Sequence, residues 1–127
     1  MILDRALERD QDELARIFLH EVFHFTWNRL GNPSRLSFER LLQAEMESRA
    51  RGELGWSAES RKKLLTSSDR LARNRKWREY CCESFCDSGA FILAERSVHP
   101  EFTLASRHRE RRRAWFRDHV LKGAIPV

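Results

Sequence analysis

The stretch Ile17–Trp27, IFLHEVFHFTW, is apolar and aromatic but carries two histidines four residues apart. A helix accounts for this spacing, because residues i and i+4 lie one above the other on the same helical face. His20 and His24 then form a pair of imidazoles about one turn apart, with Glu21 beside the first of them. The stretch therefore predicts a helix over residues 4–28 that brings both histidines to one site.

The apolar residues in and around this stretch recur at steps of three and four. This periodicity is typical of a helix that buries one stripe of side chains against a core. We expect the buried stripe to consist of Leu14, Ile17, Phe18, Val22 and Phe25.

Turn and capping residues divide the middle of the chain. Pro33, in the segment LGNPS, prevents the first helix from continuing. Ser34 or Ser37 is expected to cap a second helix, which Gly52 would terminate. The segment GWSAESRKKLL predicts a short third helix with Ser57 as its N-terminal cap.

The second half of the chain also reads as helical. A fourth helix is expected over residues 68–96, with a basic first half, an apolar second half and Gly89 as a weak point. Residues 97–106 predict a loop, and Ser106 is expected to cap a last helix that extends to Val120. Strand signals are nearly absent, so the predicted fold class is all-α.

Composition limits the classes of protein that remain. With 127 residues, of which 41% are hydrophobic, the chain predicts one folded domain over residues 1–127 with a modest core. The formal net charge of +5 comes mainly from arginine. Two interpretations stay open: an acidic or nucleic-acid partner, or an arginine-rich codon composition without a binding role. The second interpretation, an arginine-rich codon composition, is the simpler of the two.

The expected location is the cytoplasm. The charged N-terminal segment MILDRALERD lacks the apolar core of a secretion signal, and no run reaches the ~18 apolar residues of a membrane span. The three cysteines, Cys81, Cys82 and Cys86, are odd in number and crowded on one segment. That arrangement argues against a disulfide framework and for a reducing compartment.

A metal site is the chemical interpretation of the histidine pair. Residues 20–24 fit the pattern His-Glu-x-x-His, and a zinc site of this kind needs a third protein ligand. Glu83 is the candidate, with Asp87 one turn further along the expected helix. Both acids interrupt the apolar run YCCESFCDSGAFIL, where burial would be costly without a partner. A metal ion and a histidine N–H would satisfy them.

The segment HEVFH followed by Glu-x-x-x-Asp resembles the gluzincin branch of the zincin metallopeptidases. This resemblance implies that His20, His24 and Glu83 bind Zn²⁺, that Glu21 is the general base, and that Asp87 orients a zinc-bound histidine. It also implies a peptide or protein substrate. The segments HEVFHFTWNRLGNP and ESFCDSGA further resemble a family of uncharacterised bacterial proteins.

The sequence departs from the zincin pattern before the first motif. Only 19 residues precede His20, which leaves no room for the β-sheet that zincins place there to bind peptides by strand addition. Two explanations stay open: a truncated or mis-started chain, or a reduced scaffold that keeps the metal site. Without the sheet, the other helices alone would have to cover Phe18, Val22, Phe25 and Trp27, so we expect an exposed apolar patch, self-association or marginal stability. Tyr80 and His99 are candidate oxyanion stabilisers, although the sequence favours a core role for Tyr80 and a loop role for His99.

Two further alternatives concern other residues. Cys82 and Cys86 are also four residues apart and could bind zinc as thiolates, or could simply be small buried side chains. The arginine-rich segment 106–120 could contact nucleic acid, with Trp115 or Phe116 stacking on bases. The spacing of these aromatics favours a helix that packs them inward while its arginines face water.

Overall fold

The computed structural model describes residues 2–94 and 103–121, and all regular structure within these residues is helical, as predicted. The elements in chain order are α1 (Ile2–Arg29), α2 (Asn32–Glu47), α3 (Trp56–Leu64), α4 (Ser67–Ala72), α5 (Arg75–Ala94), α6 (Ser106–Phe116) and a π-helical turn, η1 (Arg117–Leu121). None of the described helices is both long enough and apolar enough to cross a membrane.

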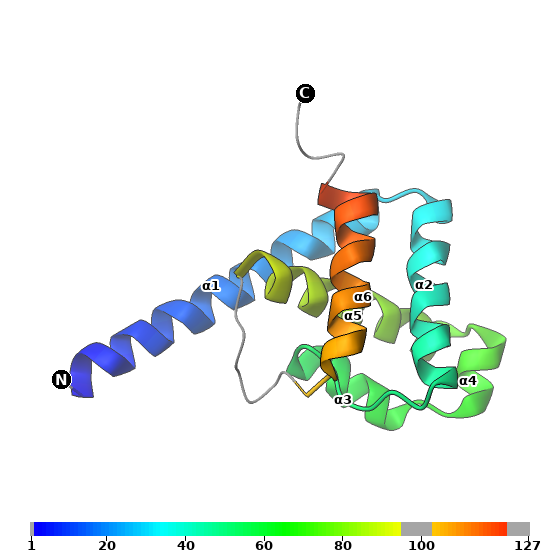
Figure 1. Ribbon diagram of the computed structural model, residues 1–127, viewed down its shortest axis with the longest axis horizontal. Coiled ribbons are helices and arrows are strands. Elements are labelled where there is room, and N and C mark those ends of the chain that lie inside the picture. Colours follow the sequence, from blue (N-terminus) through cyan, green and yellow to red (C-terminus); the bar gives the residue numbers. More distant parts are fainter. Residues whose placement is uncertain (1, 95–102, 122–127) are drawn as a thin grey trace.

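Helix α5 is the centre of the fold. It contacts each of the other five α-helices, and its second half is buried almost throughout. Figure 1 shows α1 crossing behind α5, with α2 and α6 on the opposite side and the N-terminal part of α1 extending away from the other helices. The apolar half of α5 is therefore the core around which the chain folds.

Aromatic rings fill the space between α5 and its neighbours. Phe85 lies at the centre, with its ring centroid 5.8 Å from Phe23, 5.6 Å from Phe38 and 4.9 Å from Phe116. Most of these contacts are edge-to-face, the geometry that the quadrupole of an aromatic ring favours. Each such pair contributes about 0.5–1.5 kcal/mol beyond its buried area.

Gly89 lies where an aromatic ring of α1 packs directly against α5. A Cβ atom at this position would lie 2.6 Å from the ring of Phe23, which is 3% exposed. Glycine in a helix interior costs about 1 kcal/mol relative to alanine. Gly89, the predicted weak point of the helix, therefore leaves the space that the Phe23 ring of α1 occupies.

The predicted buried stripe of α1 is wrong. Leu14, Phe18 and Phe25 are 65%, 67% and 70% exposed, while Phe23 and Trp27 on the opposite side are buried. The reason is that α5 is the main packing partner of α1 and covers only one side of it. Of the residues expected in an exposed apolar patch, Phe18, Val22 and Phe25 are exposed, whereas Trp27 is buried. The large exposed apolar side chains among the described side chains of α1 are Leu14, Ile17, Phe18, Val22 and Phe25.

Several predicted helix ends also need correction. Helix α2 begins at Asn32 with Gly31 as its N-cap, so Pro33 lies in its first turn and Ser34 and Ser37 lie within it. Proline suits the first turn because no intrahelical partner exists there for its missing N–H. Helix α2 ends at Glu47, before Gly52.

The other corrections concern the later helices. Gly55, not Ser57, is the N-cap of α3, and Ala105, not Ser106, is the N-cap of α6. The predicted fourth helix is two helices, because Arg73 adopts a left-handed conformation with φ 49° at the end of α4. Asn74 then accepts a hydrogen bond from the backbone N–H of Trp77 at 3.2 Å, as a cap of α5 does. Residues 95–102 of the predicted helix and loop lie outside the described residues.

The last helix packs Trp115 and Phe116 inward, as predicted, but not all of its arginines face water. Arg112 is fully buried and pairs with Glu45 at 2.6 Å and with Glu53 at 2.7 Å. Burial alone would raise the pKa of Glu53, but the Arg112 guanidinium outweighs it and holds this pKa below its usual value. This ionic cluster joins α2, the α2–α3 connection and α6.

Candidate metal centre

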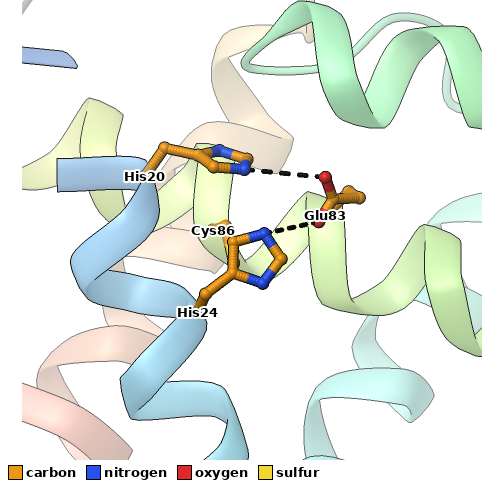
Figure 2. Close-up of side chains that lie close together, drawn as sticks. All are labelled: His20, His24, Glu83 and Cys86. Atoms are coloured by element: carbon orange, nitrogen blue, oxygen red, sulfur yellow. Dashed lines mark ion pairs between the residues drawn. The ribbon is translucent and has the colours of Figure 1, made fainter. Parts of the chain in front are cut away.

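Four side chains from two helices form a cluster that can hold a metal ion. His20 and His24 come from α1, and Glu83 and Cys86 come from α5. One donor atom from each lies within 4.8 Å of the other three. Figure 2 shows both imidazoles turned toward Glu83, with Cys86 behind His24. The structure therefore brings together the three predicted ligands and adds a fourth donor.

Glu83 lies between the two rings. Its Oε2 is 2.9 Å from Nε2 of His24, and its Oε1 is 3.6 Å from Nε2 of His20. Both Nε2 atoms thus face the same carboxylate, while the ring centroids are 5.0 Å apart. Imidazole nitrogen and carboxylate oxygen are donors that zinc accepts, so the donor set fits such an ion.

Asp87 fixes the orientation of His20. Its Oδ1 is 2.7 Å from Nδ1 of His20, and its Oδ2 accepts a hydrogen bond from the backbone N–H of Ala58 at 2.9 Å. A carboxylate on Nδ1 holds the proton there and leaves Nε2 free to bind a metal. The predicted orienting contact of Asp87 on a histidine is therefore present, and the histidine is His20.

The carboxylate of Asp87 also caps the N-terminus of α3. Gly55, the N-cap residue, makes no side-chain cap hydrogen bond, and a Cβ on it would overlap the carboxyl group of Asp87. Asp87 binds the amide of Ala58, which is a free donor in the first turn of α3. One aspartate from α5 thus positions both a histidine of α1 and the start of α3.

The electrostatics of the cluster favour a bound cation. Burial lowers the pKa of His20, but the hydrogen bond to Asp87 and the nearby Glu83 carboxylate outweigh it and raise this pKa to about 10. Burial raises the pKa of Glu83, yet the neighbouring side chains of His20, His24 and Arg61 bring it below its usual value. Two buried carboxylates therefore require positive charge, which a proton on His20 or a metal ion can supply.

The cysteines lie on the inner side of the cluster. Cys86 is fully buried, and Sγ of Cys82 is 3.7 Å from Nδ1 of His24. The hydrogen bond between the two thiols lowers the pKa of Cys82 and raises that of Cys86. Cys86 must lose its proton before it can bind a metal as a thiolate.

A cavity of about 280 Å³ opens in front of the cluster. Besides the predicted ligands and Asp87, its lining includes Glu21 and Ile17 from α1 and Trp56 and Ser57 from α3. Glu21 is exposed and stands outside the four-residue cluster. Its carboxylate therefore belongs to the same cavity without being among the clustered donors.

The two candidate oxyanion stabilisers are not brought to the cluster. Tyr80 is buried and its hydroxyl donates to Glu53, within the ionic cluster of Arg112. His99 lies outside the described residues. The sequence had raised Cys86 only as a partner of Cys82, although its position three residues after Glu83 places both on one face of a helix. The amide of Ala58 had no signal in the sequence.

Comparison of the chain with protein-family models, with curated proteins and with solved structures gave no significant match. The chemistry of the centre is therefore inferred from its own residues.

Proposed function

We propose that this protein is a zinc-dependent hydrolase that cleaves an amide bond, with a peptide or protein as its substrate. The observation that carries the proposal is the contact of Asp87 with Nδ1 of His20, which leaves Nε2 of the same ring facing Glu83. The resemblance to gluzincins implies this combination of two histidines, a glutamate and an orienting aspartate.

His20, His24 and Glu83 would hold the metal ion. A zinc ion supplies Lewis acidity, which polarises a carbonyl group and lowers the pKa of a bound water toward ~7. Glu21 is the proton carrier of the proposal, because it is exposed on the wall of the cavity that contains these ligands. Its carboxylate accepts the proton of the attacking water and passes it to the leaving amine.

The walls of the cavity would hold the substrate. All regular structure in residues 2–94 and 103–121 is helical, so strand addition to a sheet edge is not available from these residues. Ile17 on one wall and Trp56 on the other are 53% and 68% exposed. Substrate contacts in this proposal are therefore made by side chains of α1 and α3.

Zinc content is the first test. The protein, purified without chelator, should contain one zinc per chain by elemental analysis. The variants His20→Ala, His24→Ala and Glu83→Gln should lose it while circular dichroism still reports a helical fold. His119→Ala is a matched control, since His119 is exposed on η1 and outside the cluster. A folded wild-type protein that stays metal-free when zinc is offered would refute the proposal.

Glu21→Gln tests the catalytic part. This variant should keep zinc and fold but lose cleavage of quenched fluorescent peptides by about 10²–10⁴-fold, the usual contribution of a general base. Glu79→Gln is the control, because Glu79 is exposed on α5 and pairs with Arg75. Loss of zinc from Glu21→Gln would make Glu21 a ligand and contradict the assignment.

A closed, non-catalytic zinc site is the second candidate, and the position of Cys86 favours it. Structural zinc sites have four protein ligands, whereas catalytic sites keep one position open. If Cys86 is the fourth ligand, cobalt-substituted protein should show thiolate-to-cobalt charge transfer that Cys86→Ser abolishes. If the site is catalytic, Cys86→Ser should keep both zinc and peptide cleavage.

A further inference from the structure

A second cavity, of about 440 Å³, lies at the end of the fold where α2 begins and α4 meets α5. Its volume falls in the range of small-molecule sites. Its lining consists of Trp27, Asn32, Arg35, Leu36, Glu39, Arg73 and Arg78. None of these residues belongs to the metal cluster or to the cavity in front of it.

The charge of this lining is positive. Its lining contains three guanidinium groups, from Arg35, Arg73 and Arg78, and one carboxylate, that of Glu39. The first turn of α2 also contributes to the lining and contains no acidic residue. The partial positive charge of this helix end is therefore not offset by acidic side chains of its own first turn.

The three arginines are held to different degrees. Arg73 makes a bidentate contact with Glu39, at 2.8 and 3.0 Å, and Arg35 donates to the carbonyl oxygen of Trp27 at 3.2 Å and to Asn32 at 2.9 Å. The charge of Arg78 helps to lower the pKa of Glu39, but no hydrogen bond or ion pair of its side chain is found within the described residues. Each guanidinium has five donors, so every one of the three retains N–H groups for a ligand.

The backbone conformation of Arg73 indicates that an arginine side chain is needed at this position. Arg73 has φ 49° at the end of α4, where glycine is the usual residue because a side chain is strained there. Its guanidinium is anchored by Glu39, which is buried and also accepts a hydrogen bond from Nε1 of Trp77 at 3.0 Å. Arg73 is thus kept at the cavity although its backbone conformation is unfavourable for any residue other than glycine.

We propose that the cavity lined by Arg35, Arg73 and Arg78 binds a small phosphate monoester. Planar guanidinium groups match the oxygens of phosphate in bidentate geometry. The excess of two positive charges over Glu39 corresponds to the roughly −1.5 to −2 charge of a phosphate monoester at pH 7. The cavity leaves room for an organic group, which Leu36 and Trp27 can contact.

The test is calorimetric titration of the full-length protein with phenyl phosphate. We expect saturable binding of one phenyl phosphate per chain, tighter than that of benzoate, which has the same ring but a single charge. Arg78→Ala should weaken binding about tenfold or more, because a charge-assisted contact is lost. Arg75→Ala is the matched control: it removes the same charge from the same helix, but Arg75 pairs with Glu79 and does not line the cavity.

Specific outcomes would overturn the proposal. Equal weakening by Arg78→Ala and Arg75→Ala would show that only the overall charge matters. Binding of phenyl phosphate unchanged by Arg78→Ala would place the phosphate elsewhere, for example at the metal centre. Tighter binding of a single-stranded oligonucleotide than of phenyl phosphate, weakened by either variant, would mark the surface as one for nucleic acid. Arg78→Ala and Arg75→Ala both leave the proposed metal ligands intact, so the difference between these two variants reports on the arginine-lined cavity and not on zinc content or hydrolysis.

Discussion

Replacing Asp87 by asparagine should weaken zinc binding while it preserves the shape of the site. Asp87 accepts two hydrogen bonds, from Nδ1 of His20 at 2.7 Å and from the amide of Ala58 at 2.9 Å. An asparagine side chain has only one acceptor oxygen, and its other end is a donor. If the oxygen stays on Ala58, the NH₂ group faces His20 and forces the ring to accept at Nδ1. The ring proton then moves to Nε2, which can no longer bind a metal.

The expected loss of zinc affinity follows from the orienting role of the contact between His20 and Asp87. Loss of an orienting partner of a metal-bound histidine typically reduces metal affinity about 10–100-fold, or roughly 1.4–2.8 kcal/mol. The opposite orientation of the asparagine would set its NH₂ group against the amide of Ala58, which leaves a buried donor without an acceptor. Neither orientation restores both contacts, so the loss should not be avoided by a flip of the side chain.

Competition with a chromophoric zinc chelator measures this affinity directly. Asp118→Asn is a suitable control, because Asp118 is exposed on η1 and carries the same change of charge. The expected order is a clear loss for Asp87→Asn and none for Asp118→Asn. If Asp87→Asn binds zinc within about twofold of the wild type while it remains folded, the proposed role of the His20–Asp87 contact is refuted.

Three further predictions concern stability. Arg112→Met should lower the free energy of unfolding at pH 7 by about 3–5 kcal/mol in chemical denaturation, because it leaves buried carboxylates unpaired. The control Arg111→Met, at an exposed arginine of the same helix, should change it by less than about 0.5 kcal/mol. The folded-state pKa of Glu53 is lowered, so its stabilising contribution is present above the unfolded-state pKa near 4.5 and is lost as the pH falls below that value. Chemical denaturation at a series of pH values should show this loss of stability in the wild type and a shallower loss in Glu53→Gln. Gly89→Ala should lower the melting temperature despite the better helix propensity of alanine, since the new Cβ would lie 2.6 Å from the ring of Phe23, and overpacking of this kind costs about 1–3 kcal/mol. An unchanged melting temperature in Gly89→Ala would mean that α1 can shift away from α5 without loss.

The sequence was sufficient to predict most of the side-chain cluster that can hold a metal ion. His20 and His24 share a face in any α-helix, and Glu83 and Asp87 do so on a second helix. Acids inside an apolar run need buried partners, which is a reason to expect the two helices to meet at this site. The fourth donor, Cys86, was missed as a member of this set because cysteine is equally common as a plain buried side chain.

Errors arose where the outcome depended on contacts distant in sequence. The periodicity of Leu14, Phe18 and Phe25 identifies an apolar face of α1, but it does not reveal whether another element covers that face. Arg112 looked like one of several solvated arginines, because its burial depends on two acids about 60 residues earlier in the chain. Likewise, the break at Arg73 results from a left-handed residue that is not glycine, for which no residue-type signal exists.

The placement of the ligands has a consequence for the unfolded chain. A metal held by His24 of α1 and Glu83 of α5 would be a reversible cross-link that closes a segment of roughly 60 residues. For a permanent cross-link of that span, the loss of chain entropy in the unfolded state corresponds to about 4 kcal/mol. Unlike a disulfide, this link would form in a reducing compartment and would open when a chelator removes the ion. The supply of metal alone would then determine whether α1 and α5 are cross-linked.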